Sequence, residues 1–446
     1  MMPSRLLGSL ATTEELAELF SDRSILAALL AFESALARAQ ARLGLIPASA
    51  GDAISRAAVA ENFDCAALAR EARRSASLAI PLVKALTARV RETDEQSARY
   101  VHWGATSQDT LDTAMVLLLG RAQTILARDH ARLVQSLRAL SGRHAETVML
   151  ARTLLQPAPP ITFGYKVAAW YGAAHRSWRR VCEAFHDALR LQFGGAAGTL
   201  AAYRQNGVTL ARELAAELRL PVGGVPWHTH RDRLAAVVVH CGIYTGALGK
   251  MSRDIALLMQ PEVAELAEAG GGSSAMPNKQ NPSGCAIALA AANRTPGLVS
   301  AFLSGMVQEH ERAVGGWQAE WPALAAVIEA TGSALDAMVR VQEGLTVYPD
   351  RMRANLAATQ GVVFAEKISL LLAAKLGREE THALLADAAR EAAESARPMR
   401  EILQRRPGIA SLLTAEQWEN IDRPEDYLGA AEEFRQRLLE DQDASD

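Results

Sequence analysis

Aromatic residues and cysteines are scarce in this sequence, and each scarcity limits what the chain can be. Phe, Trp and Tyr make up 5% of the 446 residues, although hydrophobic residues as a whole make up 49%. A core with so few rings must consist mainly of Ala, Leu and Val, and Ala and Leu are strong helix formers. The cysteines lack the paired spacing of a metal site, so we expect reduced thiols in a reducing cytosol. They are Cys65, Cys182, Cys241 and Cys285.

An excess of basic charge is also missing. The chain has 47 Lys and Arg against 50 Asp and Glu, which gives no electrostatic reason to expect nucleic acid or an anionic membrane as a partner. Residues Met1–Leu10 lack the long apolar core of a signal peptide. The longest uncharged run, Leu234–Gly249, contains His240 and three glycines and is short for a membrane span. We therefore expect a soluble, cytoplasmic protein that captures any anionic substrate with local cations.

Hydrophobic periodicity predicts helices throughout the chain. Apolar residues from Ile25 to Leu43 recur at steps of three and four, and no strand alternation of useful length is present. The longest helices are apolar around more of their circumference than one chain can bury, so we expect an oligomer. The long helical patterns cover about 112–145, 161–190, 234–259 and 285–309, and a last one ends near 344. The prediction is an all-α chain with an N-terminal helical domain (1–110), a central long-helix bundle (111–346) and a C-terminal helical domain (347–446).

Residues 270–285 interrupt two of these helical patterns. They read Gly-Gly-Gly-Ser-Ser-Ala-Met-Pro-Asn-Lys-Gln-Asn-Pro-Ser-Gly-Cys, which is too rich in Gly and Pro for a regular helix. A hydroxyl near a cation, on backbone rich in exposed N–H groups, can bind a carboxylate and handle a proton. The alternative is a polar linker between two helices, and composition alone leaves both open.

A second polar segment, Tyr100–Thr110, precedes the longest helical pattern. We expect Asp109 or Thr110 to be the N-cap, which places Thr106 and Ser107 just before a helix N-terminus. The N–H groups and the positive dipole end form an anion site at such a position. Simple capping is the alternative interpretation.

Two further segments interrupt the helices. Residues 152–160 are rich in proline, and Gln192–Thr199 is a glycine-rich turn. That turn lacks the Gly-x-x-x-x-Gly-Lys-Ser/Thr spacing of a phosphate loop, and no strand is predicted before it. The pattern therefore excludes nucleotide binding at this turn.

Three of these segments together resemble a known superfamily. The order Gly272-Ser-Ser-x-Met-Pro-x-Lys-x-Asn-Pro282 resembles the signature loop of the fumarase/aspartase superfamily. His102-x-Gly-x-Thr-Ser-x-Asp109 is similar to its first conserved segment in the adenylosuccinate-lyase-like form, and Arg152-Thr-x-x-Gln156 is similar to the second.

Finer matches resemble one branch, the bacterial 3-carboxy-cis,cis-muconate cycloisomerases, over nearly the whole chain. They include Ile80-Pro-Leu-Val-Lys84, residues 192–199, residues 308–321 and Arg351-Met-Arg-Ala-Asn-Leu356. The resemblance implies a homotetramer with a core of about twenty long helices. Each active site would combine segments of three subunits, without a metal or an organic cofactor. One carboxylate of a diene triacid would add across a double bond to form 4-carboxymuconolactone, in protocatechuate breakdown.

By position in these motifs, the resemblance assigns catalysis to Ser273 and Lys279. Ser273 would donate the proton in lactonisation, while Lys279 and Asn281 would hold the carboxylate that takes up negative charge. Because a serine alkoxide is disfavoured in water, Lys279 and loop N–H groups must stabilise it. Thr106 and Ser107 would bind a substrate carboxylate. Further substrate contacts are assigned to His102, Gln156, Ser274, Met276, Asn278, Gln280 and Arg312.

Two departures from the superfamily pattern bear on the reaction and the substrate. Leu154 stands where fumarases and adenylosuccinate lyases have a histidine for acid–base work. Lactonisation has no leaving group to protonate, so this absence favours a cycloisomerase. Asn278 and Gln280 stand where most relatives have His and Arg beside the signature lysine, and these amides can donate to a sulfonate.

Three alternatives therefore accompany this interpretation. The first is a 3-sulfomuconate cycloisomerase, possessing that activity alone or together with the carboxylate one. The second is an amine- or nitrite-eliminating lyase of the superfamily, which Leu154 and the segment with Trp317 and Trp321 disfavour. The third is a non-catalytic scaffold, which the presence of Ser273 and Lys279 disfavours.

Overall fold

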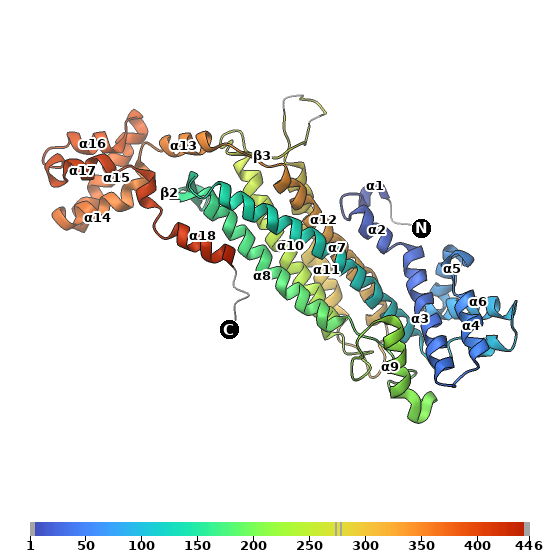
Figure 1. Ribbon diagram of the computed structural model, residues 1–446. Coiled ribbons are helices and arrows are strands. Elements are labelled where there is room, and N and C mark those ends of the chain that lie inside the picture. Colours follow the sequence, from blue (N-terminus) through green and yellow to red (C-terminus); the bar gives the residue numbers. More distant parts are fainter. Residues whose placement is uncertain (1–4, 273, 277–278, 441–446) are drawn as a thin grey trace. The chain divides into compact units, whose positions relative to one another are not determined.

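The computed structural model describes residues 5–272, 274–276 and 279–440, and helices dominate these ranges (Figure 1). The prediction of an all-α fold is confirmed. The chain divides into two compact units. The first unit comprises Met1–Ala131, Arg176–Gly249 and Ile287–Ala337, and the second comprises Arg132–His175, Lys250–Ala286 and Met338–Asp446. The three domain boundaries inferred from the sequence stay a prediction.

Five long helices each begin in one unit and end in the other. The longest, α7, has 37 residues, which is a length of roughly 55 Å at the usual rise per residue. Glycines let α10 approach α11 closely, because an added Cβ at Gly249 would lie 2.5 Å from the Cβ of Ala292. The five helices are α7 (Ser107–Arg143), α8 (Phe163–Ala188), α10 (Asp232–Leu258), α11 (Ser283–Ser304) and α12 (Gly316–Glu343).

Shorter helices complete the first unit. Helix α3 packs against α9 and the turn before it through a fully buried cluster that includes Phe32, Leu36 and Leu210. The added helices are α1 (Arg5–Gly8), α2 (Glu14–Leu19), α3 (Asp22–Arg42), α4 (Ala48–Ala57), α5 (Cys65–Ser75), α6 (Ala79–Arg91) and α9 (Gly207–Leu218), with 3-10 turns η1 (Ala60–Asn62), η2 (Ser97–Tyr100) and η3 (Ala201–Asn206).

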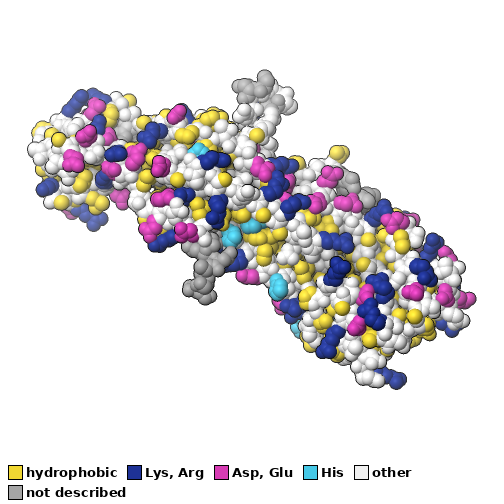
Figure 2. Space-filling view, viewed as in Figure 1, with side chains coloured by type: hydrophobic (Ala, Val, Ile, Leu, Met, Phe, Trp, Pro, Cys, Tyr) yellow, Lys and Arg dark blue, Asp and Glu magenta, His cyan; other side chains and the backbone are white. Residues whose placement is uncertain are grey.

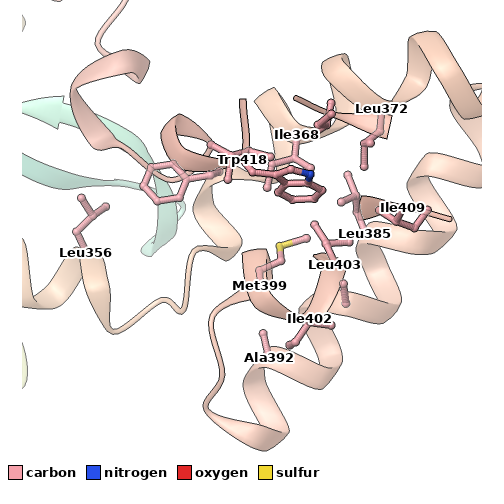
Figure 3. Packing of buried hydrophobic residues seen from close by; sticks show 14 of the residues in the cluster. Leu356, Ile368, Leu372, Leu385, Ala392, Met399, Ile402, Leu403, Ile409 and Trp418 are labelled. Carbon is pink, nitrogen blue, oxygen red and sulfur yellow. The ribbon is translucent and has the colours of Figure 1, made fainter. Parts of the chain in front are cut away.

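The second unit has its own hydrophobic core, shown in Figure 3. Met399, Ile402 and Leu403 of α16 pack there with Trp418 of α17 and Ile368 of α14. Its helices are α13 (Pro349–Ala357), α14 (Ala365–Leu376), α15 (Arg378–Ser395), α16 (Met399–Arg405), α17 (Ala415–Asn420) and α18 (Ala431–Glu440), with 3-10 turns η4 (Val362–Phe364), η5 (Ala410–Leu412) and η6 (Pro424–Tyr427).

The second unit also contains strands, which the sequence reasoning did not anticipate. β1 (Val148–Thr153) pairs antiparallel with β2 (Gln156–Thr162), and β3 (Leu266–Ala267) pairs with β4 (Thr346–Val347). The expectation of no useful strand was wrong because β2 reads Gln-Pro-Ala-Pro-Pro-Ile-Thr, and proline is normally depleted in strands. A two-stranded hairpin has only edge strands, where proline N atoms need no ladder partner.

Helix α11 leaves much of its apolar surface exposed. Within the described ranges, four helices (α3, α10, α11 and α12) are long and apolar enough to cross a membrane by length and composition alone. In α3, α10 and α12 more than half of the apolar window is buried within the protein, but in α11 only 22% is buried. Figure 2 shows one face of the molecule, on which apolar side chains reach the surface between charged ones. The exposure of α11 fits the expectation that one chain cannot cover its own long helices.

Candidate active site

Helix α7 begins at Ser107, earlier than predicted. The Thr110 N–H donates to the Thr106 carbonyl at 3.3 Å, which places Thr106 in the N-cap position. The Asp109 carboxylate accepts from the Thr106 N–H at 3.1 Å, as the third helical residue does in a capping box. The prediction of Asp109 or Thr110 as the N-cap was therefore wrong. Asp109 lies in the first turn of the helix, and its side chain accepts from the N–H of the N-cap residue Thr106. Thr106 and Ser107 lie at the positive end of the dipole, where an anion is favoured.

The buried Asp109 carboxylate also holds the glycine-rich turn against this helix start. It accepts from the N–H groups of Gly194 and Gly195, each at 2.9 Å, and from Nε2–H of His228 at 2.9 Å. An added Cβ at Gly194 would lie 2.7 Å from the His228 ring, so this approach requires glycine. The turn thus has a structural role that its sequence did not reveal.

Arg312 reaches the carbonyl side of the same turn. Its Nη2–H donates to the Gly195 carbonyl at 3.0 Å, and its Nε–H donates to the Ala196 carbonyl at 3.2 Å. Burial lowers the pKa of Arg312, and the charges of Asp109 and Asp112 only partly offset this effect. A guanidinium stays protonated at neutral pH even so. Arg312 is therefore a cation bound to the glycine-rich turn, and Asp109 holds the same turn against the start of α7.

His102 lies in the loop just before α7, and its ring points to α3. Its Nδ1–H donates to Oε1 of Glu33 at 2.7 Å. Burial on its own lowers the pKa of His102, but the charges of Glu33 and Asp109 outweigh it and the pKa is raised. Four of the predicted site residues, His102, Thr106, Ser107 and Arg312, thus belong to the first unit.

A buried ion network supports this group. The Arg231 guanidinium donates to Asp112 of α7 at 2.7 and 3.1 Å and to Glu320 of α12 at 2.9 Å. Trp317 donates its indole N–H to Asp112 at 2.9 Å. Because two carboxylates share one cation in a buried place, burial dominates at Glu320 and raises its pKa to about 7. The network joins α7 and α12 to residue 231, which directly precedes α10.

The remaining predicted residues belong to the second unit, and those described are mostly exposed. Gln156 begins β2 and pairs with Thr153 across a two-residue turn. The turn consists of Leu154 and Leu155, which are 96% and 74% exposed and have φ values of 50° and 64°. Such turns favour Asn-Gly, and a leucine in the left-handed region is strained. Two apolar side chains therefore project from a strained hairpin tip beside Gln156.

The signature loop closes on itself at its base. The Asn281 N–H donates to the Gly271 carbonyl at 2.6 Å, and its side-chain amide donates to the Gly272 carbonyl at 3.2 Å. Gly271 has a φ of 77°, and an added Cβ there would overlap the Asn281 carbonyl oxygen, so this neck requires glycine. Ser274, Met276, Lys279 and Gln280 are exposed, whereas Ser273 and Asn278 lie outside the described residues.

Sequence reasoning missed the residues that organise the first-unit group. Asp109 was interpreted only as a helix cap and as the end of a motif, and His228, Glu33 and Arg231 belonged to no motif. For Glu33 the available signal was a charged residue inside an otherwise apolar helical pattern, since such residues are seldom buried without a partner. Among the described residues, no group of three or more His, Cys, Asp or Glu is placed to hold a metal ion.

Comparisons with known proteins agree with this architecture. Residues 9–297 match the family model described as a lyase, and residues 361–438 match that of the adenylosuccinate lyase C-terminus. A 3-carboxy-cis,cis-muconate cycloisomerase of Bradyrhizobium diazoefficiens is 44% identical over 441 residues, which covers 98% of each chain. The corresponding enzyme of Pseudomonas aeruginosa is 44% identical and covers 94% of this chain and 92% of its own.

A solved structure is similar over the same extent. The crystal structure of the 3-carboxy-cis,cis-muconate lactonizing enzyme from Pseudomonas putida has a TM-score of 0.92 and 41% identity, covering 98% of each chain. The chain therefore belongs to the lyase family of the fumarase/aspartase superfamily, in the branch of the 3-carboxy-cis,cis-muconate cycloisomerases.

Proposed function

We propose that this protein lactonises 3-carboxy-cis,cis-muconate to 4-carboxymuconolactone, in the protocatechuate branch of the β-ketoadipate pathway. The observation that carries the proposal is full-length similarity to cycloisomerases, with 44% identity over 98% of both chains. Leu154 adds a chemical argument. The intramolecular addition needs no acid for a leaving group, and the hairpin tip supplies none.

The reaction places negative charge on a carboxylate and requires one proton. Addition of a carboxylate oxygen to the conjugated acid gives an enediolate-like intermediate, and a proton must then reach the adjacent carbon. In the proposal Ser273 supplies this proton, and Lys279 holds the carboxylate that becomes enediolate. Ser274, Met276, Asn278, Gln280, Asn281 and Gln156 surround the substrate from the second-unit segments. No metal or organic cofactor takes part in these steps.

The first-unit group then binds the substrate carboxylates that do not react. The start of α7 offers N–H groups and the helix dipole through Thr106 and Ser107, while Arg312 and His102 supply positive charge. These cations compensate for a chain whose net charge is −3. A trianionic substrate therefore meets two cationic side chains and a helix N-terminus in this group.

We infer that a homotetramer completes each site with segments from three subunits. The two groups of predicted site residues lie in different units of one chain. The exposed apolar surface of α11, of which 22% of the window is buried, supports assembly through the long helices. In the proposal the protein is soluble, because the apolar helices face each other rather than lipid, and cytoplasmic, because its cysteines are expected to be reduced thiols.

A second candidate substrate is 3-sulfomuconate. Asn278 and Gln280 replace a ring and a charge that most relatives carry beside the signature lysine, and Gln280 is exposed. Their amide N–H groups can donate to sulfonate oxygens without adding charge. An amine- or nitrite-eliminating lyase is disfavoured by Leu154.

The test follows the loss of diene absorbance in the ultraviolet with enzymatically made 3-carboxymuconate, and then with 3-sulfomuconate. Turnover of the first substrate with formation of the lactone is expected. Activity on neither substrate would reject a muconate cycloisomerase.

A variant then tests the assignment of the proton donor. Ser273→Ala is expected to lower turnover by about 10²–10⁴ with the oligomer intact, because proton transfer loses its donor. Ser274→Ala is the matched control in the same loop and should lose far less. A near-normal rate for Ser273→Ala would remove Ser273 from the mechanism.

A further inference from the structure

Glu33 is a buried carboxylate beneath the loop that carries His102. It lies in the middle of α3, a helix otherwise packed into the apolar core of the first unit, and its side chain has no exposed surface. Its Oε1 accepts from His102 Nδ1–H at 2.7 Å and from the Thr110 hydroxyl at 2.9 Å. A carboxylate in such a place carries a high desolvation cost unless a cation offsets it.

The group that can compensate the charge of Glu33 is the ring of His102, which carries a positive charge when both of its nitrogens are protonated. The other oxygen, Oε2, has no hydrogen-bond partner within the described residues. Within the described residues, the charges that act on the ring are those of Glu33 and of Asp109 of α7, and both are carboxylates. A positively charged imidazolium is therefore the state that both carboxylates favour.

The backbone fixes the direction of the ring. His102 has a φ of 56°, in the left-handed region that a side chain normally avoids. The next carbonyl, of Trp103, accepts from Gln40 Nε2–H at 2.7 Å and from the Tyr203 hydroxyl. Gly104 has a φ of 74° and packs against Tyr203 so closely that an added Cβ would lie 2.6 Å from its ring. The strained loop is held from two sides, and Nδ1 is committed to α3.

We propose that Glu33 is a positioning residue, which fixes His102 as an imidazolium whose Nε2–H binds a carboxylate of the substrate. The His102 side chain is 15% exposed although Nδ1 faces a fully buried partner, so the far edge of the ring is the part open to a ligand. His102 then adds a third cation to Lys279 and Arg312 for a substrate with three carboxylates. This inference rests on the proposed function for the identity of that substrate.

The test compares Glu33→Gln with the wild type over a range of pH. The amide keeps the size and an acceptor oxygen but removes the charge of Glu33, so only Asp109 then opposes the effect of burial and the pKa of His102 falls. In the wild type the imidazolium persists to higher pH than in the variant. We expect kcat/KM of Glu33→Gln at pH 8 to fall roughly 10-fold or more, mostly through KM, and to approach the wild type near pH 5.5.

Control variants separate this role from a merely structural one. Glu33→Asp keeps the charge and should restore part of the high-pH activity. Glu329→Gln, a partly buried glutamate of α12 in the same unit, should leave the pH profile of kcat/KM unchanged. In a His102→Gln background, Glu33→Gln should cause no further loss of high-pH affinity. If Glu33→Gln does not fold, the pH profile of Glu33→Asp and the loss of high-pH affinity in His102→Gln alone still test the role.

A second readout does not require turnover. Calorimetric titration with propane-1,2,3-tricarboxylate should show about 10-fold weaker binding to Glu33→Gln at pH 8 and more proton uptake on binding. A wild type inactive on both muconates rejects the proposed function, and the titration then decides the role of Glu33 alone. A folded Glu33→Gln whose pH profile and titration match the wild type overturns the inference.

Discussion

The two groups of predicted site residues differ in how firmly the fold holds them. In the first unit, Asp109 accepts four N–H donors and Arg231 joins two buried carboxylates, so the group proposed to bind anions is organised without a ligand. In the second unit, Lys279 and Gln156 are exposed. Lys279 lies on the signature loop and Gln156 lies beside the hairpin tip. If the proposed roles hold, substrate binding relies on a packed, hydrogen-bonded group, whereas the chemistry relies on residues of which those described are mostly exposed.

Replacing a cation by methionine should lower stability in the first unit and turnover in the second. These are the largest effects we expect. Arg231→Met leaves Asp112 and Glu320 buried without their cation, which should cost about 3–5 kcal/mol of unfolding free energy. Lys279→Met should leave the unfolding free energy within about 0.5 kcal/mol of the wild type. Its turnover should nevertheless fall by about 10²–10³, because the enediolate carboxylate loses its cation.

Denaturant unfolding followed by circular dichroism measures the first effect, and the muconate assay measures the second. A stable Arg231→Met, or an unstable Lys279→Met, would erase the distinction between the two groups.

Glu320 should make the rigid group sensitive to pH. Its pKa is about 7 in the folded protein against 4.5 for an ordinary glutamate, so the folded state binds more protons between these values. Stability from this group is therefore present at low pH and is lost as pH rises from about 4.5 to about 7, by on the order of 3 kcal/mol.

Thermal unfolding at pH 5.5 and pH 8 measures the larger part of this loss. Glu320→Gln should reduce the difference between the two pH values, while Glu217→Gln, at an exposed ion pair with Arg38 and Arg42, should not. An unchanged difference in Glu320→Gln would show that the ion network does not titrate in this range.

The smallest effect concerns the hairpin tip of the second unit. Replacing Leu154-Leu155 by Asn-Gly supplies residues that accept positive φ, and should slow amide exchange in β1 and β2 by about 1–2 kcal/mol of opening free energy. Faster exchange in the variant would show that the leucines stabilise the turn instead of straining it.

Local patterns were sufficient for the helices and for part of the site. Periodicity predicted the long helices to within a few residues, because apolar stripes at helical spacing require only local information. The β1–β2 hairpin was missed because prolines at 157, 159 and 160 are acceptable only when a strand has no further neighbour. The start of α7 was misplaced because Asp109 caps from inside the helix, a choice that depends on contacts 85 residues away with Gly194.

The sequence by itself determined the helical class, the glycine-rich segments and the residue types available for anion binding. Only the tertiary structure decided which of them meet: Glu33 with His102, Asp109 with the turn at 194–195, and Arg231 between Asp112 and Glu320. The physical reason is that a buried charge is tolerated only next to its partner, and partners from distant segments leave no local pattern in the chain.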